Sequence, residues 1–454
     1  MSSMGRARGW QQDLRDMAQV AAPIVLINVG IQAMGLVDTL MVGRLGGAAI
    51  AAVALGNFYF FNVSVFGIGL LFALDPVVAQ AVGAGDSEAV SRGVQRGLLM
   101  ASAVALVVML ALLPGEWLLG SLRQPPEVVS ETAVYARRRL LGALPFFVFN
   151  VFRQTLQAMG PTRPIIAAAL VANVVNALAN WLLIEGRGGF PALGVEGAGY
   201  ATAISMWVMC LVLGWLAWPL LRPTLKPWRP EVWDAAPMWR MLRIGAPIGT
   251  QWFFESFAFG LTALFMGWMG TAALAGHEIA LSMAAMTFMV PLGISGAAAA
   301  VVGRAIGRGD LSSARSDAAA AIICGVGFMS ISALVFILAP EWLATRYTSE
   351  AATVAVAVAL IPLAGWFQIF DGLQAVTSGV LRGVGDTRIP AILHMVAFWG
   401  IGVPLGYVLG FHTGYRERGL WIGLVAGLAA AALLQSARVW RRLRAPIRRV
   451  VVDH

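Results

Sequence analysis

Charge is scarce in this sequence, and that scarcity decides the class of protein. Only 12% of the 454 residues are charged, whereas 59% are hydrophobic. A soluble domain carries about 25% charged residues. The apolar runs are long and continuous and do not alternate with polar residues, which excludes a transmembrane β-barrel. The composition therefore predicts an all-α integral membrane protein.

Cysteine is almost absent, and histidine is rare. The two cysteines, Cys210 and Cys324, lie in apolar runs, so they allow no disulfide framework and we interpret them as small core residues. No His and Cys pair has metal-site spacing, and no phosphate-binding Walker sequence is present. We therefore expect no cofactor, no enzymatic activity and no direct coupling to ATP. The polar stretch up to Met17 lacks a cleavable signal.

The net charge of +9 raises the question of a nucleic-acid partner. The arginines flank apolar runs and form no continuous stripe, so we expect no nucleic acid to bind. Six of them gather at the end of the chain: Arg438, Arg441, Arg442, Arg444, Arg448 and Arg449. We interpret this basic tail as a contact for anionic membrane lipids, in preference to a specific regulatory role.

The apolar runs predict twelve membrane-spanning helices of roughly 20 residues or more. They are expected at 18–42, 52–82, 97–113, 136–158, 164–184, 196–220, 241–268, 278–303, 317–340, 352–382, 389–411 and 419–437. The run at 52–82 is too long for one straight crossing, so it is expected to protrude or tilt. Most Lys and Arg residues fall on the side of the two termini and the even-numbered loops, which predicts cytoplasmic termini.

A stretch rich in proline interrupts the spans halfway along the chain. It contains Pro223, Pro227, Pro230 and Pro237, and it predicts a linker between two six-helix halves. The expected organisation is a cytoplasmic N-terminus at 1–17, an N-lobe at 18–220, a cytoplasmic linker at 221–240, a C-lobe at 241–437 and a basic cytoplasmic tail at 438–454.

An internal repeat supports two pseudo-symmetric lobes. Three short segments recur at an offset of 224 or 225 residues: 22–24 at 246–248, 78–86 at 302–310, and 156–163 at 381–388. Each half contains an even number of spans, so both face the same way across the membrane. The space between such halves is the expected place for a substrate.

Three acids stand inside apolar runs, namely Asp38, Glu255 and Asp371. A charged side chain at the centre of a membrane helix costs about 2.5–3.5 kcal/mol on insertion scales, so it is expected to have a functional reason. The repeat does not duplicate these acids, which favours function over a purely structural role. The alternative is a carboxylate that only locks helix packing.

Aromatic and amide side chains accompany the acids. Phe254 and Phe367 are possible cavity aromatics that hold a flat cation by cation–π attraction, although core or lipid packing is the alternative for each. Asn176 and Asn180 share one helix face, and with Thr202 they are candidates for holding Na⁺ or a protonated acid. Interhelical hydrogen bonding is the alternative for these three.

Two further polar residues interrupt the spans. Asp75 precedes a proline, and we interpret it as a local turn or gate residue. His394 suits either a proton relay or a hydrogen-bonded core histidine, and the sequence leaves both open.

At these residues the chain resembles the multidrug and toxic compound extrusion (MATE) family, in its NorM-like branch. The stretches that carry the resemblance are Val37–Gly43, Trp252–Ser256, Gly276–Ala280, Asp371–Gln374 and Leu381–Asp386. The likeness extends over nearly the whole chain in span number, repeat and linker.

The resemblance implies a secondary antiporter of the bacterial inner membrane, acting as a monomer, that exports cationic amphiphilic drugs in exchange for Na⁺ or H⁺. By analogy, Glu255 and Asp371 form a C-lobe cation site, which holds Na⁺ if transport is sodium-coupled. Asp38, Asn176, Asn180 and Thr202 form an N-lobe counterpart. Relatives often carry a tyrosine where this chain has Phe367, so one phenol oxygen ligand is missing.

The mechanism we expect is competition between mobile cations for the buried carboxylates. Two alternatives belong to other classes. A lipid-linked oligosaccharide flippase needs cationic groups for a pyrophosphate, whereas the charges in the middle of the spans are mostly acidic. An intramembrane transferase needs a cluster of His and Asp or a metal site near one interface, and none is visible in the sequence.

Overall fold

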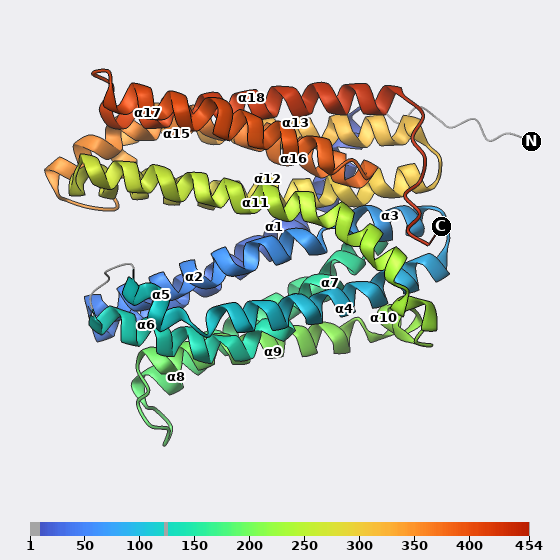
Figure 1. Ribbon diagram of the computed structural model, residues 1–454, viewed down its shortest axis with the longest axis horizontal. Coiled ribbons are helices and arrows are strands. Elements are labelled where there is room, and N and C mark those ends of the chain that lie inside the picture. Colours follow the sequence, from blue (N-terminus) through green and yellow to red (C-terminus); the bar gives the residue numbers. More distant parts are fainter. Residues whose placement is uncertain (1–9, 122–125, 454) are drawn as a thin grey trace, which may run out of the picture. The chain divides into compact units, whose positions relative to one another are not determined.

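A computed structural model describes residues 10–121 and 126–453, and the regular elements of this part of the chain are all helical (Figure 1). Its contacts divide these residues into two units. The N-terminal unit comprises residues 26–249 with 451–453, and the C-terminal unit comprises residues 10–25 with 250–450. Helices α1 (Trp10–Val42) and α11 (Ala235–Met269) each begin in one unit and end in the other.

The N-terminal unit holds the end of α1, the helices that follow it and the start of α11. Its elements are η1 (Gly43–Leu45), α2 (Gly47–Leu71), α3 (Leu74–Gly83), α4 (Ser87–Leu112), α5 (Gly115–Ser121), α6 (Pro126–Arg139), η2 (Leu140–Gly142), α7 (Ala143–Met159), α8 (Arg163–Glu185), α9 (Val195–Leu216), α10 (Trp218–Leu225) and η3 (Pro230–Trp233). Helices α8 and α9 lie side by side (Figure 1).

The C-terminal unit holds the start of α1, most of α11 and the remaining helices. Its elements are α12 (Thr271–Gly307), α13 (Leu311–Leu338), α14 (Pro340–Ala344), α15 (Ala351–Val384), α16 (Arg388–Met395), the π-helix η4 (Val396–Gly402), α17 (Val403–Phe411) and α18 (Arg416–Arg444). Helix α15 packs against α12, α13 and α18, so it is the central helix of this unit.

Within the described residues, ten helical segments are long and apolar enough to cross a membrane. The other two expected spans are also helical. The span at 136–158 is divided by the 3₁₀ turn η2 and leaves α7 with 17 residues. The span at 241–268 falls on α11, which carries Gln251, Glu255 and Ser256 in its middle. A turn therefore distinguishes the span at 136–158 from the ten apolar segments, and polar residues distinguish the span at 241–268 from them.

The long run at 52–82 is interrupted at Phe72 and Ala73 between α2 and α3. That it protrudes or tilts in the membrane stays a prediction. Pro76 explains the break, since it has no N–H to donate to the carbonyl of Phe72. The amide of Asp75 donates to that carbonyl instead, at 3.1 Å. Asp75 thus lies in the first turn of α3, beside the break.

The repeat predicted from sequence reappears in backbone detail. Asp86 and Asp310 are the N-caps of α4 and α13, and each carboxylate accepts the amide N–H three residues on, at 2.9 and 3.0 Å. The preceding glycines, Gly85 and Gly309, have φ of 71° and 75°, a conformation that side chains disfavour. Equivalent residues therefore begin equivalent helices.

Glycine lets the last helices approach closely. A Cβ placed on Gly423 of α18 lies 2.3 Å from the Cα of Gly406 in α17, and one on Gly427 lies 2.9 Å from the Cα of Gly402. Both distances are too short for any side chain. These contacts are the close backbone packing that small residues permit between membrane helices.

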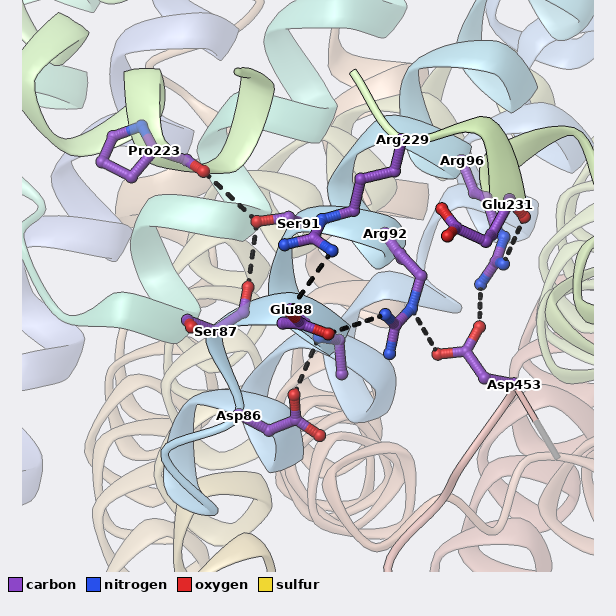
Figure 2. Close-up of polar contacts among 11 residues, drawn as sticks. Asp86, Ser87, Glu88, Ser91, Arg92, Arg96, Pro223, Arg229, Glu231 and Asp453 are labelled. Atoms are coloured by element: carbon purple, nitrogen blue, oxygen red, sulfur yellow. Dashed lines mark hydrogen bonds and ion pairs between the residues drawn. The ribbon is translucent and has the colours of Figure 1, made fainter. Parts of the chain in front are cut away.

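The expected linker and tail are partly helical. Residues 221–240 include the end of α10, the turn η3 and the start of α11, and the first part of the basic tail continues α18 to Arg444. Beyond it, Asp453 accepts hydrogen bonds from the Nε of Arg92 at 2.8 Å and from the fully buried Arg96 at 2.5 Å (Figure 2). Figure 2 also shows Arg96 donating to the carbonyl of Glu231, at 2.7 Å.

The lobe boundaries predicted from the linker remain a prediction. The division by contacts runs through α1 and α11, and the first nine residues of the expected 1–17 segment lie outside the described residues.

Candidate cation site

The N-terminal unit brings together the four polar residues predicted for its half of the site. The Oδ1 atom of Asp38 accepts from the amides of Asn176 at 2.9 Å and Asn180 at 2.6 Å, and Oδ2 accepts from the hydroxyl of Thr202 at 2.8 Å. All four side chains are buried. One carboxylate thus receives three donors from α8 and α9, which suits its ionised form because each donor faces a lone pair.

Two residues near Asp38 were not predicted from the sequence as members of the site. Tyr135 is fully buried; its hydroxyl donates to Asn57 at 3.0 Å and accepts from Arg139 at 3.1 Å. The charge of Arg139 acts on Asp38. The sequence places Arg139 at a span end, where it counts only toward topology, so no local signal assigns it to the acid.

In the C-terminal unit, α11 supplies Glu255 and α15 supplies Asp371. The Asp371 side chain is buried, and the Glu255 side chain is 20% exposed. Asp371 lies within range of the negative charge of Glu255. Among the described residues, no side chain donates a hydrogen bond to Asp371. Two acids that repel each other in a place of low polarity are disposed to share one positive partner.

His394 of α16 contacts this pair. Its Nε2 atom lies 3.4 Å from Oε2 of Glu255, and its Nδ1 atom lies 3.3 Å from the amide nitrogen of Gln374 on α15. The imidazole is buried and stacks on Phe398, with ring centroids 4.6 Å apart. Of the two interpretations of His394, the structure supports a histidine that is hydrogen-bonded, to Gln374, and it adds that a site acid lies next to the other ring nitrogen.

The two predicted aromatics lie in different surroundings. Phe254 is half-buried and packs edge-on against Trp399, at 6.0 Å between centroids. Phe367 is buried and packs against Phe259 and Trp421 in the hydrophobic core. Phe367 therefore contributes to core packing, and its ring carries no oxygen that coordinates a cation.

A second polar group on α15 was not predicted. The Oε1 atom of Gln368, next to Phe367 in the chain, accepts from Thr287 at 2.7 Å and from Ser332 at 2.8 Å. Glutamine inside an apolar run was the only sequence signal for it, and that signal does not distinguish a site from packing.

The comparison with known families settles the class of protein. The MatE family model matches residues 23–182 and again residues 247–408, with the second match starting 224 residues after the first. The chain belongs to the MatE family. This offset equals the one in the internal repeat, so the two halves of this MATE chain are two copies of one family unit. The family is one of transporters, and the chain is not an enzyme.

Curated relatives of this MATE chain match over almost its full length. The "Probable multidrug resistance protein NorM" of Mesorhizobium japonicum is 36% identical over 446 residues, covering 96% of this chain and 95% of the relative. The "Multidrug resistance protein NorM" of Burkholderia vietnamiensis is 38% identical over 435 residues, covering 94% and 93%. These similarities confirm the resemblance to the NorM-like branch.

Solved structures share the fold at lower identity. The "eukaryotic MATE transporter AtDTX14" superposes with a TM-score of 0.88 at 22% identity, covering 96% of this chain and 98% of that one. The "Vibrio cholerae MATE transporter VcmN in the bent form" gives 0.82 at 21% identity, covering 96% and 98%. The predicted all-helical membrane fold is therefore confirmed.

Proposed function

We propose that this protein is a secondary antiporter that exports cationic amphiphilic compounds by alternating access, in exchange for protons. The observation that carries the proposal is the pair Glu255 and Asp371, two acids on membrane helices that act on each other and that few donors satisfy. A buried pair of this kind favours a bound cation, which either a proton or a cationic drug supplies. The printed names of the curated relatives support the drug as substrate.

The ligand set supports H⁺ over Na⁺ as the coupling ion. Both oxygens of Asp38 already face donors, and the imidazole of His394 faces Glu255. Phe367 offers no oxygen. Sodium, a hard cation, needs several oxygen ligands around it, whereas a proton needs one lone pair. Residues Glu255 and Asp371 would hold Na⁺ if the coupling were to sodium.

The bacterial relatives and the distribution of Lys and Arg support our proposal for the location of the protein. We place the protein in the bacterial inner membrane as a monomer with cytoplasmic termini, the orientation that the Lys and Arg residues favour. The flippase and transferase alternatives draw no support from the curated relatives, which are named as multidrug resistance proteins.

Transport in proteoliposomes tests the proposal. The purified full chain is reconstituted, and uptake of ethidium, a flat cationic dye, is followed after a proton gradient (acidic lumen) or a Na⁺ gradient is imposed. We expect the proton gradient alone to drive uptake. Uptake driven by Na⁺ alone would overturn the choice of ion, and no uptake with either gradient would contradict export.

A matched pair of acid variants links transport to the site. Asp371→Asn removes one acid of the pair and is expected to reduce uptake by at least about tenfold, the effect of losing a contact of about 1.4 kcal/mol. Glu278→Gln removes an exposed acid of the same unit and is expected to transport normally. Equal uptake by both variants at equal reconstitution would remove the pair from the mechanism.

A further inference from the structure

The imidazole of His394 has two polar contacts that together define its protonation. The amide nitrogen of Gln374 carries hydrogens and no free lone pair, so at 3.3 Å it donates to Nδ1. A neutral imidazole that accepts at Nδ1 carries its proton at Nε2. That Nε2 atom makes no hydrogen bond in the described part of the chain, and Oε2 of Glu255 lies 3.4 Å from it, on a side chain that is 20% exposed and can turn to accept.

We propose that His394 is a positioning residue that presents a fixed N–H to the Glu255 carboxylate and thereby sets how readily that acid exchanges its cation. The proposal rests on the proposed function of Glu255 as a cation site. In this role the imidazole stays neutral and moves no proton. It favours the ionised form of Glu255, which is the form that binds a cationic substrate.

The segment that follows His394 also contacts α11 close to Glu255. The π-helix η4 begins two residues after His394. Its wider turn brings residues five apart onto one face, and such turns often occur at functional sites. Five residues after His394, the indole N–H of Trp399 donates to the backbone carbonyl of Phe254 at 3.3 Å, and its ring stacks on Phe257. His394 and Trp399 thus contact α11 at adjacent residues.

Among the groups that surround His394, the charged neighbour is the carboxylate of Glu255. From α15, the amide of Gln374 contacts the ring, and Asp371 of the same helix is affected by the charge of Glu255. From η4, Phe398 covers one face of the imidazole. On α18, which also packs against α16, Arg438 pairs with Asp386 at 2.8 Å instead.

Binding of ethidium to the detergent-solubilised full chain, measured by fluorescence across pH, tests the proposal. In His394→Leu the carboxylate loses its donor, so Glu255 keeps its proton to higher pH and the midpoint of dye binding rises by about 1 pH unit. In His394→Gln the side-chain amide still donates, and the midpoint stays within about 0.3 of the parent value. Gln374→Leu removes the donor to Nδ1, so the imidazole proton is no longer fixed at Nε2. We expect this variant to raise the midpoint of dye binding by a smaller amount.

His277 provides the matched control. It is equally buried in the same unit, but its Nδ1 accepts from the indole of Trp421 and no carboxylate contacts it in the described part of the chain. His277→Leu should leave the midpoint unchanged.

An unchanged midpoint in both His394→Leu and Gln374→Leu would overturn the role of His394, while dye binding itself would remain. If the parent protein bound no dye at any pH, the proposed function would fail instead. If His394→Leu does not fold, Gln374→Leu is used in its place. The infrared band of the protonated Glu255 carboxyl is then followed with pH, and a midpoint unchanged from the parent would overturn the role of His394.

Discussion

The carboxylates of the two units have opposite surroundings. Asp38 accepts hydrogen bonds from three buried side chains, so its negative charge is compensated within the N-terminal unit. Glu255 and Asp371 act on each other with like charge, and the contact from His394 is a long one. A buried charge is tolerated when donors surround it and is costly when they do not. The comparison indicates a carboxylate surrounded by hydrogen-bond donors in one unit and a pair of acids with few donors in the other.

The largest effect that tests this comparison is expected at Asp38. Asp38→Asn leaves one amide oxygen for Asn176 and Asn180, and its NH₂ group makes the Thr202 hydroxyl accept and direct its own hydrogen to the carbonyl of Ala198. The bonds then lose the carboxylate charge that strengthens them. We expect the free energy of unfolding to fall by about 2–4 kcal/mol, since hydrogen bonds to charged groups contribute about 1.5–3 kcal/mol each. Denaturant unfolding in detergent measures the change. Unaltered stability would mean that the three donors do not compensate the charge.

A smaller effect on stability is expected at Glu255, although transport is lost. In Glu255→Gln an amide oxygen can take the place of the carboxylate oxygen next to His394, and the repulsion with Asp371 disappears. Replacing an incompletely paired buried charge by a neutral group is often neutral or stabilising, so the free energy of unfolding should change by less than about 1 kcal/mol. Ethidium uptake should fall to background. If Glu255→Gln lowered the free energy of unfolding as much as Asp38→Asn, the carboxylates of the two units would not differ in how well their charges are compensated.

At a third carboxylate, Asp453, which arginines compensate, we expect an effect on stability alone. Burial raises the pKa of Asp453, but the hydrogen bonds and charges of Arg96 and Arg92 outweigh it and hold this pKa below the ordinary value of 3.8. The stabilisation is therefore present above the ordinary value and is lost as the pH falls through the lower, folded-state value. Asp453→Asn should lower the free energy of unfolding at neutral pH by about 1 kcal/mol.

The pH dependence separates this effect from packing. Below the folded-state pKa of Asp453, parent and variant should unfold with equal free energies, because the parent carboxyl is then protonated. An equal difference at neutral and acidic pH would show that the carboxylate charge contributes nothing. The result bears on the comparison, because it measures compensation by cations against compensation by the neutral donors at Asp38.

Much of the fold was predictable, because its signals are local. Apolar runs mark membrane helices wherever they occur. The recurrence of 78–86 at 302–310 predicted two related halves, and in the structure Asp86 and Asp310 begin equivalent helices. The break at Phe72 was not predicted, although Pro76 lies nearby, because length alone suggested a tilted helix. Site membership was harder. Arg139 stood at a span end, where it counted only toward topology, and Gln374 was one polar residue among many.

The sequence by itself determined the membrane class, the repeated halves, the family and the three acids, because hydropathy, recurrence and an acid within an apolar run can all be seen along one dimension. Only the tertiary structure decided which acid is compensated. Asp38 meets its donors from α8 and α9, and Glu255 meets His394 from α16, through contacts between segments far apart in the chain. Hydrogen bonds depend on distances of a few tenths of an ångström, and helix packing sets those distances.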